Sequence, residues 1–306
     1  MEDIHINESI KRLSRKELNE YKKSLKMAEV EEVIDLVFYR PIAFILVKLV
    51  YNTKVTPDQL TLTAIVMGLI SGILYSFGLP LTGYIGAFFY FTFIIFDCSD
   101  GQLARLKKNG TPFGRLLDGI ADYFVITAIY VGITIGYSQK GDHTHMLLLL
   151  ILSAISIIIQ EVLVDYYRTR FLDIVMSRNN TFEEGIREYR NQYIKLKIQK
   201  DKWFKKSIIY IYLVYSKVQR SLTTKKKREE FYNADPKDYY RKNRILIRLW
   251  VFMGPSAMRT TLMICSIFAL FHIYFIITIG VFNILAVILW IIQRQVDKSY
   301  VIQPKL

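Results

Sequence analysis

Four aspartates lie inside one of the most apolar stretches of this 306-residue chain. They occur in the segment "FDCSDGQLARLKKNGTPFGRLLDGIAD", where Asp97 and Asp100 precede an Asn-Gly and Pro turn and Asp118 and Asp122 follow it. Spacings of three and four residues place each pair on one face of a helix. In an antiparallel hairpin centred near Asn109, Asp100 faces Asp118 and Asp97 faces Asp122. The sequence therefore predicts four carboxylates that converge in one pocket.

The chemistry expected of such a pocket is the binding of divalent cations. Without cations, mutual repulsion and desolvation would keep some of the carboxylates protonated. Carboxylate oxygens suit hard ions such as Mg²⁺, which usually completes its octahedron with water and substrate phosphate. Two metals bridged by shared carboxylates would form the clamp used for in-line displacement at phosphorus. A diphosphate-bearing substrate is therefore the expected ligand.

A simpler interpretation is that these acids cap helices or pair with Arg105, Arg115 and the lysines of the turn. It suits a single acid better than four acids in register. Small residues are interspersed with the acids and are expected to let the two helices approach closely. They are Gly101, Ala104, Gly114, Gly119 and Ala121.

The elements that must position these acids are membrane helices. The chain is 52% hydrophobic and yet carries a formal charge of +14, a combination typical of a membrane protein with a basic aqueous face. Windows of about 20 apolar residues predict six transmembrane helices. They are 60–77, 81–103, 113–137, 146–167, 256–271 and 273–292. Residues 33–50 are interrupted by Arg40, Pro41 and Lys48, and are predicted to form an amphipathic helix in the membrane interface, with a spanning helix as the alternative.

The distribution of basic residues predicts the orientation. Loops 78–83 and 139–145 contain one basic residue, Lys140, whereas the other side receives both termini, the turn after Asp100 and the basic segment 178–248. The positive-inside rule places that side in the cytosol. The first thirty residues have no apolar core of a signal peptide, so none is expected to be cleaved. An integral protein of a bacterial or archaeal plasma membrane is expected, with its active site facing the cytosol.

Four parts of the chain follow from this organisation. Residues 1–55 form a cytosolic segment with the amphipathic helix, 56–177 the first four spans, 178–248 a basic cytosolic insert, and 249–306 the last two spans and the tail. The insert is expected to form amphipathic helices on the membrane surface. It contains no recognisable nucleic-acid-binding module, so no nucleic acid is expected as a partner. Cys98 and Cys265 suggest neither a disulfide nor a zinc site.

The acidic motif resembles the signature of the CDP-alcohol phosphotransferases, integral membrane enzymes of phospholipid synthesis. It reads D-x-x-D-G-x-x-A-R, then eight residues, then G-x-x-x-D-x-x-x-D, and it is carried by Asp97, Asp100, Gly101, Ala104, Arg105, Gly114, Asp118 and Asp122. The resemblance implies transfer of a substituted phosphoryl group from a CDP-linked donor to an alcohol, with release of CMP. It extends loosely over the six spans, does not explain the insert, and implies a homodimer.

The resemblance also implies roles for individual residues. The four aspartates would hold two divalent ions, Mg²⁺ or Mn²⁺, and Asp122 would also act as general base on the acceptor hydroxyl. The nucleotide would be bound by Gly101, Ala104, Arg105 and Gly114. In "TPDQLT", Asp58 departs from the Asn of many relatives, and Thr61 is a candidate nucleotide contact.

Arginines near the predicted cytosolic ends of the spans could bind the phosphate of an acceptor. Arg168 and Arg170 end the fourth span, and Arg248 and Arg259 flank the start of the fifth. Snorkelling to lipid headgroups explains them equally well. The favoured donor is CDP-diacylglycerol and the favoured acceptor is phosphorylated or polyhydroxyl, such as glycerol phosphate or inositol phosphate. One alternative is a transferase of the CDP-choline or CDP-ethanolamine type that uses diacylglycerol as acceptor. Another, from a different class, is a cation transporter. The outer halves of the second and third spans are apolar, which disfavours a transporter.

Overall fold

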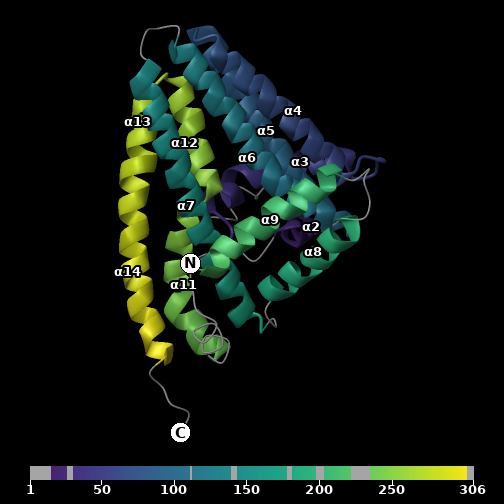
Figure 1. Ribbon diagram of the computed structural model, residues 1–306. Helices are drawn as coiled ribbons and strands as arrows, with labels where there is room; N and C mark the ends of the chain where they lie inside the picture. Colours follow the sequence, from purple (N-terminus) through teal and green to yellow (C-terminus); the bar gives the residue numbers. More distant parts are fainter. Residues whose placement is uncertain are drawn as a thin grey trace. The chain divides into compact units, whose positions relative to one another are not determined.

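The computed structural model describes residues 15–25, 30–110, 112–138, 143–177, 181–197, 203–221 and 235–301. These residues are almost entirely helical, and no strand occurs among them (Figure 1), so the predicted all-α fold is confirmed. The chain divides into two compact units, one from Met1–Ser156 and Pro255–Gly280 and the other from Ile157–Gly254 and Val281–Leu306.

The first unit contains the acidic motif. Its elements are α2 (Arg15–Ser24), the π-helical turn η2 (Asp35–Tyr39), α3 (Arg40–Val50), α4 (Pro57–Ser76), α5 (Pro80–Lys107), α6 (Pro112–Ser138), the first part of α7 (His143–Val175), α12 (Pro255–Ile267), α13 (Phe271–Phe275) and most of the π-helical turn η4 (Ile276–Val281). The second unit contains the rest of α7, α8 (Thr181–Lys197), α9 (Trp203–Ser221), α11 (Pro236–Phe252) and α14 (Phe282–Val301).

Local sequence fixes the ends of the helices that carry the site. The Oγ1 of Thr56 accepts a hydrogen bond from the backbone N–H of Gln59, and the Gln59 side chain accepts one from the N–H of Thr56, which is a capping box at the start of α4. Helix α5 ends where Lys108 adopts a left-handed conformation, with φ at 53°. Helix α6 begins at Pro112, so the predicted turn between the second and third spans is confirmed.

Helix α4 packs against both α5 and α6 in the first unit (Figure 1). Its close approach to α6 depends on glycines outside the acidic motif. A Cβ atom added at Gly72 would lie 2.7 Å from the carbonyl oxygen of Ala128, and one added at Gly132 would overlap the carbonyl oxygen of Gly72. A Cβ at Gly119 would meet nothing within 4 Å. The prediction that Gly119 belongs to a close helix contact was therefore wrong; the tight contact lies further along α6.

Five helices in the described part of the chain are long and apolar enough to cross a membrane. They run over Pro57–Ser76, Pro80–Lys107, Gly119–Ser138, Thr144–Val175 and Phe271–Tyr300. The fifth predicted span corresponds to α12, which has 13 residues. Such a helix is about 20 Å long, shorter than the hydrocarbon core of a bilayer. A membrane-spanning helical protein is thus supported, and the span predicted at 256–271 stays a prediction.

The predicted helix at 33–50 corresponds to η2 and α3. Pro41 stands in the first turn of α3, where a missing N–H costs no hydrogen bond, so it marks the passage from one element to the next. Ala43, Phe44 and Val47 are buried, whereas Ile45 and Leu49 are exposed. The helix is present with an apolar exposed side, and its placement in the membrane interface stays a prediction.

Candidate active site

Two of the four aspartates converge on one arginine. Asp97 of α5 accepts a hydrogen bond from Nη1 of Arg259 at 2.8 Å, and Asp122 of α6 forms an ion pair with Nη2 of the same side chain. The side chains of Arg259, Asp97 and Asp122 are 13%, 14% and 31% exposed. The guanidinium also lies over the Phe93 ring, 5.6 Å from its centre. The predicted pairing of Asp97 with Asp122 agrees with this shared contact.

Asp100 lies three residues after Asp97 on α5 and is only 4% exposed. Its Oδ2 accepts a hydrogen bond from the hydroxyl of Thr61 on α4. The Thr61 hydroxyl is also 3.2 Å from the carbonyl oxygen of Pro57, one turn earlier on α4. Thr61, expected to contact the nucleotide, therefore supports a carboxylate of the acidic motif.

Asp118 lies on α6, one turn before Asp122, and its side chain is outside the described residues. Among the side chains that are described, no three His, Cys, Asp or Glu residues are grouped so that they could hold a metal ion. Two carboxylates from different helices nevertheless meet at one positive charge, that of Arg259. An all-oxygen donor set at a point that favours a cation suits Mg²⁺ or Mn²⁺, so the residues fit the expected ions.

The predicted nucleotide contacts lie on the last turns of α5 and the first turns of α6. A Cβ atom added at Gly101 would lie 3.4 Å from the guanidinium of Arg105, which is the nearest group there. The Nε of Arg105 donates a hydrogen bond to the carbonyl oxygen of Ser24. A Cβ atom added at Gly110 in the turn would lie 3.3 Å from the Cβ of Ala104, and Gly114 lies in the first turns of α6. The nearest group beside Gly101 is therefore the end of a flexible side chain.

The four predicted acceptor-binding arginines have different surroundings. Arg259 lies in the first unit with the aspartates, and the other three lie in the second. Arg170 forms two hydrogen bonds of 2.9 Å with Asp297 of α14 and is 7% exposed. Arg168 is half-buried, and its Nε has no hydrogen-bond partner within the described chain. Arg248 is exposed on α11. Only Arg259 is brought to the acidic motif within one unit.

Residues that hold α12 in place were missed in the sequence. Both carboxylate oxygens of Glu32 accept hydrogen bonds from backbone N–H groups at the start of α12, from Ser256 at 3.1 Å and from Ala257 at 3.0 Å. The hydroxyls of Tyr39 and Thr260 are 2.8 Å apart. A carboxylate at a helix N-terminus satisfies free N–H groups and complements the helix dipole. Glu32 thus fixes the helix that carries the arginine between the two aspartates.

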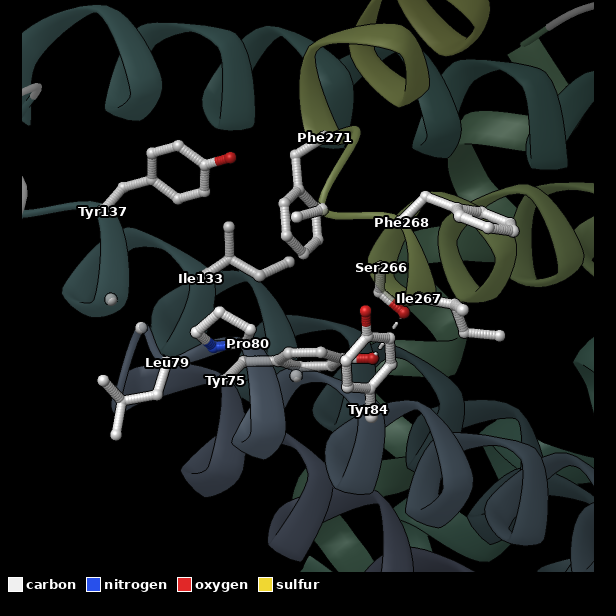
Figure 2. A pocket seen from close by; sticks show the side chains of 14 residues that line it. Tyr75, Leu79, Pro80, Tyr84, Ile133, Tyr137, Ser266, Ile267, Phe268 and Phe271 are labelled. Carbon is white, nitrogen blue, oxygen red and sulfur yellow. Dashed lines mark hydrogen bonds between the residues drawn. The ribbon is translucent and has the colours of Figure 1, made fainter.

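A cavity of about 110 Å³ lies at the other end of the same helices (Figure 2). It is lined by residues from the end of α4, the start of α5, the end of α6 and the break between α12 and α13, and none of the lining residues that the structure describes is acidic or basic. The hydroxyl of Tyr75 donates a hydrogen bond of 2.8 Å to Ser266 in its wall. This cavity is separate from the acidic motif.

The fold and the site define a helical membrane protein with carboxylates gathered near one end of its apolar helices. The family model for CDP-alcohol phosphatidyltransferase matches residues 54–214, more than half of the chain. The chain belongs to the CDP-alcohol phosphatidyltransferase family. The match contains the whole acidic motif and reaches through α8 into α9, so it includes part of the basic insert.

Two curated proteins are similar to shorter stretches of the chain. The phosphatidylinositol phosphate synthase of Corynebacterium glutamicum is 37% identical over 100 residues, which is 32% of this chain and 42% of that protein. The bifunctional IPC transferase and DIPP synthase of Thermococcus kodakarensis is 36% identical over 72 residues, 24% of this chain and 16% of that protein. The chain thus spans less than half the length of these relatives.

Proposed function

We propose that the protein is a membrane enzyme that transfers a substituted phosphoryl group from a CDP-linked donor to an alcohol and releases CMP. The observation that carries this proposal is the convergence of Asp97 and Asp122 on a single cationic group, with Asp100 one turn away on α5. Clustered carboxylates at the end of apolar helices are costly unless they bind cations or substrate. Membership of the family supports the same reaction class.

Asp97, Asp100, Asp118 and Asp122 would hold two divalent ions, Mg²⁺ or Mn²⁺. Divalent ions, when bound, would neutralise the diphosphate and the charge that develops on the departing CMP. The hydrogen bond from Thr61 would fix the rotamer of Asp100, the most buried of the three described acids. Preorganised ligands of this kind reduce the cost of binding.

Asp122 would act as general base because its side chain, 31% exposed, is more accessible than that of Asp97. The acceptor hydroxyl would give its proton to the Asp122 carboxylate while its oxygen forms a bond to the phosphorus of the transferred group. The bond from that phosphorus to the bridging oxygen would break, and CMP would leave with the electron pair. General-base catalysis of this kind contributes about 10²–10⁴-fold in rate.

The favoured donor is CDP-diacylglycerol and the favoured acceptor is phosphorylated or polyhydroxyl. The two relatives, a phosphatidylinositol phosphate synthase and a bifunctional IPC transferase and DIPP synthase, support an acceptor of the inositol phosphate type. Arg259 would place a positive charge beside Asp122, where an acceptor phosphate would lie. Arg168, Arg170 and Arg248 are the further candidates for that phosphate. Gly101, Ala104, Gly114 and Arg105 would accommodate the nucleotide.

The distribution of basic residues supports an active site on the cytosolic side of the membrane. The relatives from Corynebacterium glutamicum and Thermococcus kodakarensis support a bacterial or archaeal plasma membrane. Family resemblance supports a homodimer in that membrane.

The test is to incubate the purified protein in lipid nanodiscs with radiolabelled CDP-diacylglycerol, Mg²⁺ or Mn²⁺ and a panel of alcohols, and to identify the labelled lipid. We expect one phosphorylated or polyhydroxyl alcohol to be labelled, and EDTA to stop the reaction. Asp122→Asn should abolish turnover, whereas Asp58→Asn, an exposed acid on α4, should leave it unchanged. Full activity of Asp122→Asn would remove the catalytic assignment. Labelling of a product from diacylglycerol and CDP-choline or CDP-ethanolamine would favour that alternative instead.

A further inference from the structure

Helix α9 is apolar on two sides, and the described residues cover only one of them. Ile208, Ile209 and Ser216 are buried, at 3%, 0% and 1% exposure. The other side carries Trp203, Tyr210, Ile211 and Val214, with exposures of 70%, 56%, 52% and 46%. Residues at positions 203, 207, 210, 211 and 214 follow one helix face. They form a continuous exposed stripe, named here the α9 stripe and defined by Trp203, Tyr210, Ile211 and Val214.

The neighbouring helix α8 does not share this character. The two helices pack side by side (Figure 1), and the rings of Tyr189 and Tyr212 meet with their centres 4.7 Å apart. Most exposed residues of α8 are charged or polar: Glu184, Arg187, Glu188, Arg190, Asn191 and Lys195. Its one large exposed apolar side chain among those described is Ile194. The α9 stripe is therefore the main apolar surface of this helix pair.

One hydrogen bond shows which part of α7 lies beside α9. The hydroxyl of Tyr215 donates a hydrogen bond of 3.4 Å to Asp165 of α7. Burial and the nearby Asp165 raise the pKa of Tyr215, so the phenol stays protonated and serves as the donor. The apolar helix within α7 starts at Thr144 and continues to Val175. Because about 20 helical residues cross the hydrocarbon core, a span that enters near Thr144 leaves it close to Asp165.

The charge of this segment matches an anionic lipid surface. Residues 181–221 contain ten Lys or Arg and four Asp or Glu. Lys and Arg side chains near an anionic membrane surface are attracted to its headgroups. Trp and Tyr are the residues that favour the boundary between hydrocarbon and headgroups. An apolar stripe with aromatic side chains in a basic segment is typical of a helix that lies in that boundary.

We propose that the α9 stripe docks onto anionic lipid at the surface of the leaflet where α7 leaves the bilayer. The apolar side chains enter the headgroup boundary, and the surrounding basic residues contact anionic headgroups. This inference stands apart from the proposed transferase activity, because it depends on the exposure and charge of α9 and on the position of Asp165 along α7.

The experiment uses the full chain with Cys98 and Cys265 replaced by Ala, in nanodiscs of phosphatidylcholine with or without phosphatidylglycerol. Spin labels are attached to Ile211→Cys or Val214→Cys on the stripe, and to Asn191→Cys on α8 as the matched control. Their accessibility to oxygen, which concentrates in the bilayer, is compared with that to a water-soluble nickel chelate. Two positions on the stripe are labelled so that the result does not depend on the folding of a single variant.

In nanodiscs with phosphatidylglycerol, both stripe labels are expected to have a ratio of oxygen to nickel accessibility several-fold higher than that of the Asn191 label. Without phosphatidylglycerol the difference is expected to shrink. Nickel accessibility at the stripe equal to that at position 191 would show a water-exposed helix and overturn the proposal. Protection of the stripe from both reagents would show that protein covers it, either another part of the chain or a second copy, and would overturn it equally.

Discussion

The ion pairs of Arg259 allow a sharp prediction about the acidic site. In Arg259→Gln, Asp97 and Asp122 lose their shared counter-ion. Removing one partner of a buried pair costs about 3–5 kcal/mol when both charges are dry. Asp122 is 31% exposed, so water recovers part of that cost, and we expect about 2–4 kcal/mol of destabilisation in EDTA. Thermal unfolding in detergent measures this loss.

Divalent ions should reduce the loss of stability in Arg259→Gln, because they can replace the guanidinium as counter-ion. A ligand at 100 times its dissociation constant stabilises a protein by about 2.7 kcal/mol. In Arg259→Gln the ions no longer compete with the guanidinium, so we expect Mg²⁺ or Mn²⁺ to raise its melting temperature more than that of the unaltered protein.

The matched control is Arg241→Gln, which removes an ion pair of a 78% exposed arginine with Asp238. Exposed ion pairs contribute about 0–1 kcal/mol to stability, so this variant should lose little stability. Mg²⁺ should change its melting temperature as much as that of the unaltered protein. The reasoning is refuted if Arg259→Gln loses no more than Arg241→Gln, or if its deficit is the same in EDTA and in Mg²⁺.

Three further predictions concern packing and support of the site. Gly132→Ala should destabilise the protein by about 1–3 kcal/mol in thermal unfolding, because its Cβ overlaps the backbone of α4. Gly119→Ala adds a Cβ in open space on the same helix and should not destabilise the protein. Equal effects of the two substitutions would disprove the close contact. Thr61→Val removes a hydrogen bond to Asp100 worth about 1.5–3 kcal/mol and should weaken Mn²⁺ binding at least about tenfold in a titration; an unchanged affinity would contradict it. Glu32→Gln should lower stability by about 0.5–2 kcal/mol, since a charged cap of α12 is lost; a melting curve identical to that of the unaltered protein would count against the cap.

The parts of the fold that could be predicted are those encoded locally. Asn-Gly and Pro mark the turn between α5 and α6, and helical spacing places Asp97 on a face that meets Asp122. Hydropathy found the long apolar helices, but it could not show that α12 ends at Ile267, because a break in an apolar run changes its mean hydropathy little.

The parts that could not be predicted depend on contacts between distant residues. Arg259 lies 162 residues after Asp97, and no local period connects them. The contact of Gly72 with Gly132 between α4 and α6 could not be predicted, because these glycines lie outside the acidic motif and no local spacing connects them. Arg259 was expected to bind an acceptor phosphate, and its position beside Asp122 is compatible with that role. The ion pairs show that Arg259 is also a counter-ion of the aspartates.

The most direct test of the central claim is a count of the divalent ions that the aspartates bind. Electron paramagnetic resonance can titrate Mn²⁺ into the purified protein in the presence of a CDP-linked lipid and measure bound against free ion. Two bound ions per chain are expected, with binding strongly reduced in Asp97→Asn and in Asp122→Asn and unchanged in Asp58→Asn. Absence of bound Mn²⁺ in the unaltered protein, or binding that survives both aspartate substitutions, would contradict the account.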